Sequence, residues 1–142
     1  MNIKSAAKMF ELSIDTLRYY ERVGVIPPVK RDKNGYRNYT TMDLNWIFLA
    51  KSLRKAELSI ESMIEFATLA QSTEDVSKAQ KEILSNQLQQ IEARIVEMEQ
   101  ARDLLIHKIA TYDEHVAQFQ AGPVEEKDIE QLWEMAHVKE ME

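Results

Sequence analysis

Two short stretches of the chain carry cationic and phenolic side chains at spacings that suit contacts with nucleic acid. In the first, Arg18, Tyr19 and Arg22 share one face of a helix expected over residues 14–23. Guanidinium groups can bind phosphates or guanine edges, and a phenol can donate to a phosphate. Asp15 lies on the same face, where a carboxylate repels phosphates unless it accepts from a cytosine amine. An ordinary exposed helix face is the alternative interpretation.

The second stretch surrounds the dipeptide Asn34-Gly35, which is typical of a two-residue type I′ hairpin turn because both residues tolerate positive φ. The sequence therefore predicts a small β-ribbon. Lys33 and Arg37 would project from it toward a nucleic-acid backbone, and Tyr36 would pack or hydrogen-bond there. A structural hairpin with solubilising charges is the alternative.

The distribution of charge also separates the two ends of the chain. The formal net charge is -6, but residues 1–56 contain eleven Lys and Arg against five Asp and Glu. Residues 57–142 carry the remaining seven basic and nineteen acidic residues, a net charge of -12. A basic end suits phosphate binding through counterion release, whereas solvated charge on two helical surfaces explains the pattern equally well.

Helix signals place the first stretch in a helix-turn-helix. An apolar-periodic helix over about residues 3–10 is followed by a short break, and Ser13 is a good N-cap for the next helix. Gly24 suits a left-handed C-terminal position, and the prolines that follow block continuation. In this motif the second helix enters the major groove of DNA.

Two further helices are expected after the ribbon. Thr40 or Thr41 caps one that runs to about Ala56, and Ser59 caps another over about residues 60–69. Their large apolar side chains read as core, although a small apolar or cationic ligand could lie between this helix pair and a second subunit. That ligand hypothesis draws on Trp46, Phe48, Met63 and Phe66.

The clearest periodicity lies in residues 71–120, where apolar residues alternate at spacings of four and three over about five heptads. This heptad seam consists of Leu84, Leu88, Ile91, Ile95, Met98, Arg102, Leu105, Ile109, Tyr112, Val116 and Phe119. A seam that long needs a partner helix, and a homodimer supplies one economically. Arg102 would fix register or would extend to solvent.

The end of the chain is a short acidic segment, residues 121–142. Ile129, Leu132, Trp133 and Ala136 form a helical stripe, and we expect it to fold back onto the head or the long helix. The expected organisation is therefore a DNA-binding head over residues 1–70, a coiled-coil helix over 71–120 and this segment.

Composition excludes several kinds of chemistry. Cysteine is absent, which removes disulfides, thiolate catalysis and thiolate metal sites. His107, His115 and His137 show no metal-ligand spacing with carboxylates, although the first two could share a helix face. No Gly-rich phosphate loop, signal peptide or membrane-spanning run is present. We expect a cytoplasmic protein without cofactor or metal and not an enzyme.

The order of elements and several motifs resemble the MerR-type transcription regulators. The run from Thr16 to Pro28, TLRYYERVGVIPP, matches the family's recognition-helix signature, and GYRNY from Gly35 to Tyr39 matches its wing. The third and fourth helices match through Asp43-Leu44, Leu53-Arg54 and Leu58-Ser59-Ile60-Glu61. The resemblance covers residues 1–70 in detail and the long helix in architecture.

The resemblance implies a mainly α fold, a winged helix-turn-helix head followed by a long coiled-coil dimerisation helix. Such dimers pair antiparallel, read a pseudo-palindromic promoter and, on binding an effector, distort an overlong spacer so that RNA polymerase engages both promoter elements. Double-stranded DNA and a second copy are the expected partners. The expected DNA-binding residues are Thr16, Arg18, Tyr19, Arg22, Lys33, Tyr36 and Arg37.

The departures from the family pattern are informative. The family commonly has glycine where this chain has Glu11, in the turn of the helix-turn-helix, and Glu57, between the third and fourth helices. The aldehyde- and electrophile-responsive branch resembles this chain most, but Ser52 takes the place of its cysteine and cannot form a thiolate adduct. The alternative from another class is a coiled-coil scaffold whose basic head binds an acidic partner.

Overall fold

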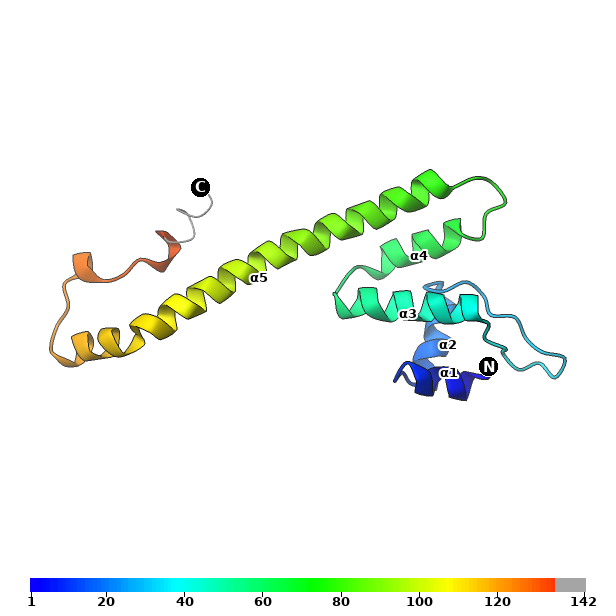
Figure 1. The fold of residues 1–142 in the computed structure, drawn as a ribbon, viewed down its shortest axis with the longest axis horizontal. Helices are drawn as coiled ribbons and strands as arrows, with labels where there is room; N and C mark the ends of the chain where they lie inside the picture. The colour runs from blue at the N-terminus through cyan, green and yellow to red at the C-terminus, as the bar shows by residue number, and fades with distance from the viewer. Residues whose placement is uncertain (135–142) are drawn as a thin grey trace. The chain divides into compact units, whose positions relative to one another are not determined.

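The computed structural model describes residues 1–134 and is helical, as the sequence predicted, with a helix-turn-helix head followed by a long helix (Figure 1). Its elements are α1 (Ile3–Met9), α2 (Ile14–Val23), α3 (Thr41–Lys55), α4 (Ile60–Leu69), α5 (Ser77–Gln120) and the 3₁₀ helix η1 (Glu126–Asp128). The chain forms two compact units, Met1–Ile91 and Glu92–Glu142. Ala136 and His137, two residues considered from the sequence, lie outside the described range.

None of the helices in this described range is both long and apolar enough to cross a membrane.

Side-chain caps set the ends of the first helices. The Ser13 hydroxyl accepts a hydrogen bond from the Thr16 amide at 3.0 Å, which satisfies a free donor at the start of α2. Gly24 ends α2 in the left-handed conformation at φ 88°, and the Val25 amide then donates to the Tyr20 carbonyl at 2.9 Å. Thr40 and Asp43 cap α3 reciprocally in a capping box. The predicted bounds of these helices are confirmed.

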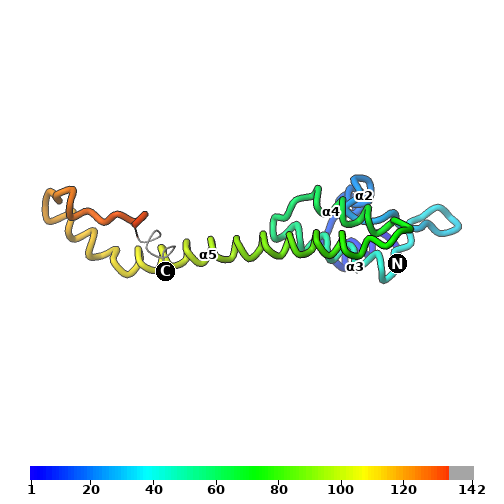
Figure 2. The backbone as a smooth tube through the Cα atoms, turned by 90° about the horizontal axis from the view of Figure 1, so that it is seen from above, coloured from blue at the N-terminus to red at the C-terminus, as the bar shows by residue number. Residues whose placement is uncertain are grey.

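The core of the first unit takes side chains from α1, α2, α3 and α4, and the last three of these helices stand together in both views (Figure 2). Leu17 of α2 and Ile47 of α3 are fully buried, and the rings of Trp46 and Phe66 pack at 5.4 Å. The prediction that Trp46, Met63 and Phe66 belong to the core is supported by their burial or half-burial. Phe48 differs, because 62% of it is exposed.

Two non-glycine residues of the described range adopt the left-handed backbone, and they are the two positions where the family pattern has glycine. Glu11 has φ 54° in the turn between α1 and α2, and Glu57 has φ 62° between α3 and α4. A Cβ in this conformation approaches the following carbonyl oxygen and costs about 1–2 kcal/mol. The left-handed backbone therefore puts local strain at both turns.

Replacing Glu11→Gly should raise the free energy of unfolding by up to about 1 kcal/mol, because strain relief outweighs the greater freedom of glycine in the unfolded chain. Chemical denaturation measures the change. Glu82→Gly, inside α5, is the control and should destabilise by about 1 kcal/mol. A loss of stability in both variants would contradict the assignment of strain to Glu11.

The wing between α2 and α3 differs from the predicted type I′ ribbon. Only Gly35 of the turn has positive φ, at 84°, so Asn34 is not left-handed and the type I′ prediction is wrong. Instead the Gly35 amide donates to the Asp32 carbonyl at 3.0 Å and the Asp32 amide to the Tyr36 carbonyl at 2.7 Å. This is the pattern of a three-residue hairpin loop with a left-handed glycine at its end.

The Asp32 carboxylate is the reason for this change. It accepts from the amides of Asn34 at 2.9 Å and Tyr36 at 3.1 Å, which stabilises the turn that begins at Asp32. The ribbon is reduced to one antiparallel bridge between Arg31 and Arg37. The loop still extends away from the helices in both views (Figures 1 and 2).

An ion pair attaches the wing to the recognition helix α2. Arg37 Nε donates to Glu21 Oε1 at 2.9 Å, and the two side chains are 20% and 16% exposed. Nearby, Tyr39 is buried, and its amide donates to the Met1 carbonyl at 2.7 Å. The wing base is therefore fixed to both α2 and the start of the chain.

Replacing Glu21→Gln should lower the free energy of unfolding by roughly 1–3 kcal/mol, because it leaves the half-buried Arg37 without its anionic partner. The matched control is Asp15→Asn, which removes the exposed partner of Arg18 at 3.7 Å. The control should change stability by less than about 0.5 kcal/mol in chemical denaturation. Equal effects of the two substitutions would show that the Glu21 pair adds no more than a surface contact.

Candidate DNA-binding surface

The exposed face of α2 displays the cationic and phenolic groups predicted from its sequence. Arg18 is 57% exposed at its side chain, Tyr19 is 37% exposed, and the Arg22 guanidinium lies 5.6 Å from the centre of the Tyr19 ring. The opposite face of α2 is buried through Leu17 and Tyr20. Burial of one face therefore fixes the other toward solvent, with two guanidinium groups and a phenol available to a ligand.

Asp15 acts on this face as a local competitor for Arg18. Its carboxylate lies 3.7 Å from the Arg18 guanidinium, one turn back along α2, and is itself 94% exposed. An exposed pair of this kind is weak, so a phosphate can displace it at little cost. Arg18 thus remains available despite its intramolecular partner.

The wing presents a second set of groups beside α2. Tyr36 is 71% exposed and Lys33 is exposed at the tip of the loop. Arg31 Nη1 donates a hydrogen bond to the Gly35 carbonyl at 2.8 Å, and this contact stabilises the turn. Arg37, by contrast, is occupied by Glu21 and therefore serves first to position the wing.

A hollow of about 650 Å³ joins the two sets of groups. Its walls come from the start of α1, from α2 and from the wing, and its charged lining is mainly cationic: Lys4, Arg18, Arg31 and Arg37 against Asp32. Phosphate oxygens are the natural ligands of such a concave cationic surface. The hollow is a candidate site for the backbone of a nucleic acid.

Burial keeps the phenol of the core residue Tyr39 uncharged. It raises the pKa of Tyr39 above its usual range, although the cation of Arg37 acts in the opposite direction. Burial likewise raises the pKa of Tyr20. Neither tyrosine therefore adds a negative charge to the cationic surface at neutral pH.

The structure brings some of the predicted site residues together and separates others. Arg18, Tyr36 and Arg37 line the same hollow. Thr16 is half-buried, and its hydroxyl lies 2.8 Å from that of Ser13 in the cap of α2. Lys33 and Arg22 are exposed outside the hollow.

Two cationic residues of the hollow were not among the predicted site residues. Lys4 and Arg31 line it, but Lys4 lies in the first helix and the role of Arg31 depends on the turn that Asp32 forms. The basic residues on either side of it, Lys30 and Lys33, were the available signal for Arg31.

Within residues 1–134, no three His, Asp or Glu side chains gather in a metal-binding arrangement.

Comparisons with known proteins agree with this geometry. The family model of the MerR HTH family regulatory protein matches residues 1–68. The HTH-type transcriptional regulator AdhR of Bacillus subtilis (strain 168) is 48% identical over 91 residues, covering 64% of this chain and 65% of that protein, slightly less than two thirds. YyaN, an uncharacterized HTH-type transcriptional regulator of the same strain, is 34% identical over 123 residues, covering 78% and 89%.

A solved structure extends the similarity to a complex with DNA. The chain is similar, with a TM-score of 0.72 and 30% sequence identity, to HiNmlR, a MerR family regulator that lacks the sensor domain and is bound to promoter DNA. The match covers 82% of this chain and 92% of HiNmlR. These relatives are named as regulators of transcription and not as enzymes, and the chain belongs to the MerR family of helix-turn-helix transcription regulators, which bind promoter DNA.

Proposed function

We propose that the chain is a homodimeric, sequence-specific regulator that binds a pseudo-palindromic promoter site and distorts the promoter spacer in response to an effector. The observation that carries this proposal is the cationic hollow in which the recognition helix and the wing meet. The family membership and the DNA complex of HiNmlR support it.

In this proposal the exposed face of α2 reads the major groove and the wing follows the adjacent backbone. Arg18, Tyr19 and Arg22 act from α2, with Thr16 at its first turn. Lys33, Tyr36 and Arg37 act from the wing, Arg37 chiefly by holding the wing against α2.

The heptad seam of α5 supports the homodimer. Most of its apolar side chains are solvent-exposed in the single chain, among them Met98 at 72%, Leu105 at 62% and Ile109 at 76%. Burying such a row in a second helix is favourable by about 25 cal/mol for each Å² of apolar surface. A second copy offers the same seam, so the pairing is self-complementary.

The acidic segment after α5 leaves most of this seam uncovered. Glu130 contacts the rings of His107 and His115, which stand two turns apart on α5, so residues 121–134 fold back onto the helix as predicted. About 200° of helical rotation separates His107 from the seam residue Leu105. His115, however, directly precedes the seam residue Val116, and Phe119 of the seam lines a small hollow together with Val124, Ile129 and Leu132 of the segment. The segment therefore reaches one side of the seam at its C-terminal end and leaves Met98, Leu105 and Ile109 exposed.

Several finer features follow from the family resemblance. The expected domains are the DNA-binding head, residues 1–70, the dimerisation helix, 71–120, and the acidic segment, 121–142. RNA polymerase is the expected partner at the promoter, and cytoplasm is the expected location. Ser52 is exposed on α3 and, as a hydroxyl, cannot perform thiolate sensing, so an effector would bind without a cysteine adduct.

Replacing Glu130→Gln should loosen the segment from α5, because both histidines lose their carboxylate partner. Amide hydrogen exchange over residues 124–132 should then become faster by roughly threefold or more, as expected for the loss of about 1 kcal/mol of local stability. Glu134→Gln is the control and should leave the exchange rates unchanged. Unaltered protection in the Glu130 variant would mean that the apolar contacts alone hold the segment.

The DNA-binding proposal is tested with an operator selected from random duplexes by the native chain. Titration across a salt series should show a preferred palindromic sequence and a steep fall of affinity with salt. Arg18→Ala should weaken operator binding by about 1–3 kcal/mol, whereas Lys81→Ala, an exposed lysine of α5, should not. Selection that returns no preferred sequence would instead favour a scaffold whose basic head binds an acidic protein.

A further inference from the structure

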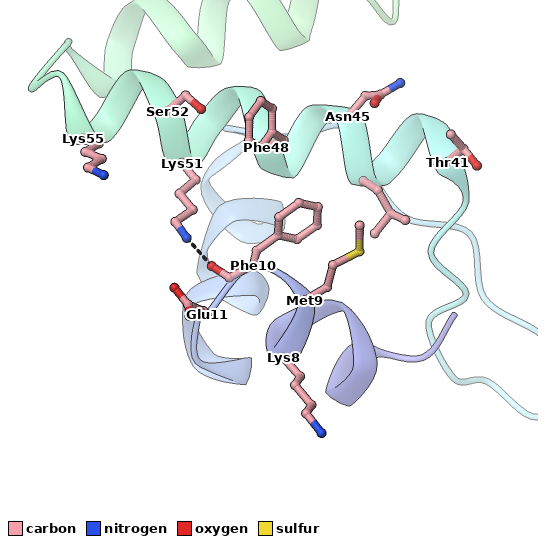
Figure 3. Close-up of a pocket in the computed structure, with 11 residues that line it drawn as sticks. Lys8, Met9, Phe10, Glu11, Thr41, Asn45, Phe48, Lys51, Ser52 and Lys55 are labelled. Carbon is pink, nitrogen blue, oxygen red and sulfur yellow. Dashed lines mark hydrogen bonds between the residues drawn. The ribbon is translucent and has the colours of Figure 1, made fainter.

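A second hollow of the head lies between α1 and α3 and plays no part in the proposed DNA contacts. Its volume is about 830 Å³, within the usual range of small-molecule sites. Figure 3 shows Phe48 of α3 facing Met9, the last residue of α1, and the C-cap residue Phe10. None of the cationic residues of the hollow beside the wing lines this one.

Two apolar side chains of this groove are exposed to solvent and do not belong to the core. Phe48 is 62% and Met9 57% exposed, and the Phe48 ring lies 6.4 Å from that of Phe10 at an angle of 40°. Their neighbour Leu44 is only half-buried. The groove therefore offers an aromatic and aliphatic floor that an apolar body of matching size can cover.

Cationic groups surround this floor. Lys51 and Lys55 stand one turn apart on α3, Lys8 lies on α1, and Glu11 is the single carboxylate of the lining. Lys51 Nζ donates to the Phe10 carbonyl, which uses one of its three donors and holds its ammonium group over the end of the floor (Figure 3). Three positive charges against one negative charge favour an anionic ligand over a cationic one.

We propose that this groove binds a small amphipathic carboxylate, its apolar body on Phe48 and Met9 and its anionic end at Lys51 and Lys55. A cationic ligand between the helix pair α3–α4 and a second subunit is disfavoured, since Trp46, Met63 and Phe66 pack into the core and lysines surround the open groove.

The groove is also placed to act on the recognition helix. The carbonyl that Lys51 holds belongs to Phe10, the residue before the strained turn at Glu11, which sets α2 relative to α1. A carboxylate that draws Lys51 away from this carbonyl changes the support of that turn. This second step rests on the proposed DNA-binding function, whereas binding in the groove does not.

The binding step is tested by calorimetry of the full chain with three probes that share one body: phenylbutyrate, phenylbutyramide and phenylbutylamine. We expect the carboxylate to bind, the amide to bind roughly tenfold more weakly because it lacks the charge-assisted contacts, and the amine not to bind. Equal affinity for all three probes, or no binding of the carboxylate, would overturn the proposal.

Variants locate the site. Phe48→Ala and Lys55→Gln should each weaken phenylbutyrate binding by roughly tenfold. Their controls are Met42→Ala, 68% exposed on α3 but outside the groove lining, and Lys81→Gln on α5. Both controls should bind as the native chain does. Because Phe48 and Lys55 are exposed, the midpoint of thermal unfolding of both variants should stay near that of the native chain. If the two variants lost no more affinity for phenylbutyrate than the controls, the ligand would bind elsewhere.

A gel-shift titration with the selected operator tests the coupling separately. Saturating phenylbutyrate should change operator affinity in the native chain and leave it unchanged in the Phe48→Ala variant. Binding in the groove with no change in operator affinity would remove the coupling and leave the site. Failure of the native chain to bind any operator would remove the proposed function and leave the calorimetric result intact.

Discussion

The exposed apolar row on α5 is the constraint on which the account of this chain depends. This helix has 44 residues, and seam side chains such as Ile109, 76% exposed, and Met98, 72% exposed, are in contact with solvent. No other part of the described chain buries them. Water contact with so much apolar surface is unfavourable, and a second identical seam removes it. The acidic segment folds back onto α5 through Glu130 and reaches the seam at Phe119, while Met98, Leu105 and Ile109 stay exposed. Two DNA-reading heads on one particle would follow from this single pairing.

Within the head, short-range interactions orient the groups that we propose to contact DNA. Caps at Ser13 and Thr40 and the left-handed turn at Gly24 set where the helices begin and end. Burial of Leu17 and Tyr20 then turns Arg18, Tyr19 and Arg22 toward solvent. The Arg37–Glu21 pair holds the wing beside them. Strain at Glu11 and Glu57 is the cost of keeping glycine-type turns with other residues. The same strained turn carries the Phe10 carbonyl that Lys51 holds, which links the α1–α3 groove to the orientation of α2.

The sequence predicts much of this because its signals are local. Helix ends follow from caps and from Gly24, and the core face of α2 follows from periodicity. The wing turn was predicted wrongly because Asn34-Gly35 suits a type I′ turn, whereas the Asp32 carboxylate, two and four residues before the amides it accepts from, begins a different turn. The partner of Arg37 was not foreseen, since Glu21 is 16 residues away. Exposure of Phe48 and the groove it lines depend on how α1 packs against α3, which periodicity does not specify.

The central claim is that two copies pair through the seam of α5, and sedimentation equilibrium tests it most directly. The native chain should behave as a particle of twice its mass of 16.6 kDa. Ile109→Lys, on the seam, should shift the equilibrium to single chains, whereas Val96→Lys, at an exposed position roughly opposite the seam, should not. A native chain that sediments as a single copy, or a dimer that tolerates a lysine at Ile109 as well as one at Val96, would contradict the account.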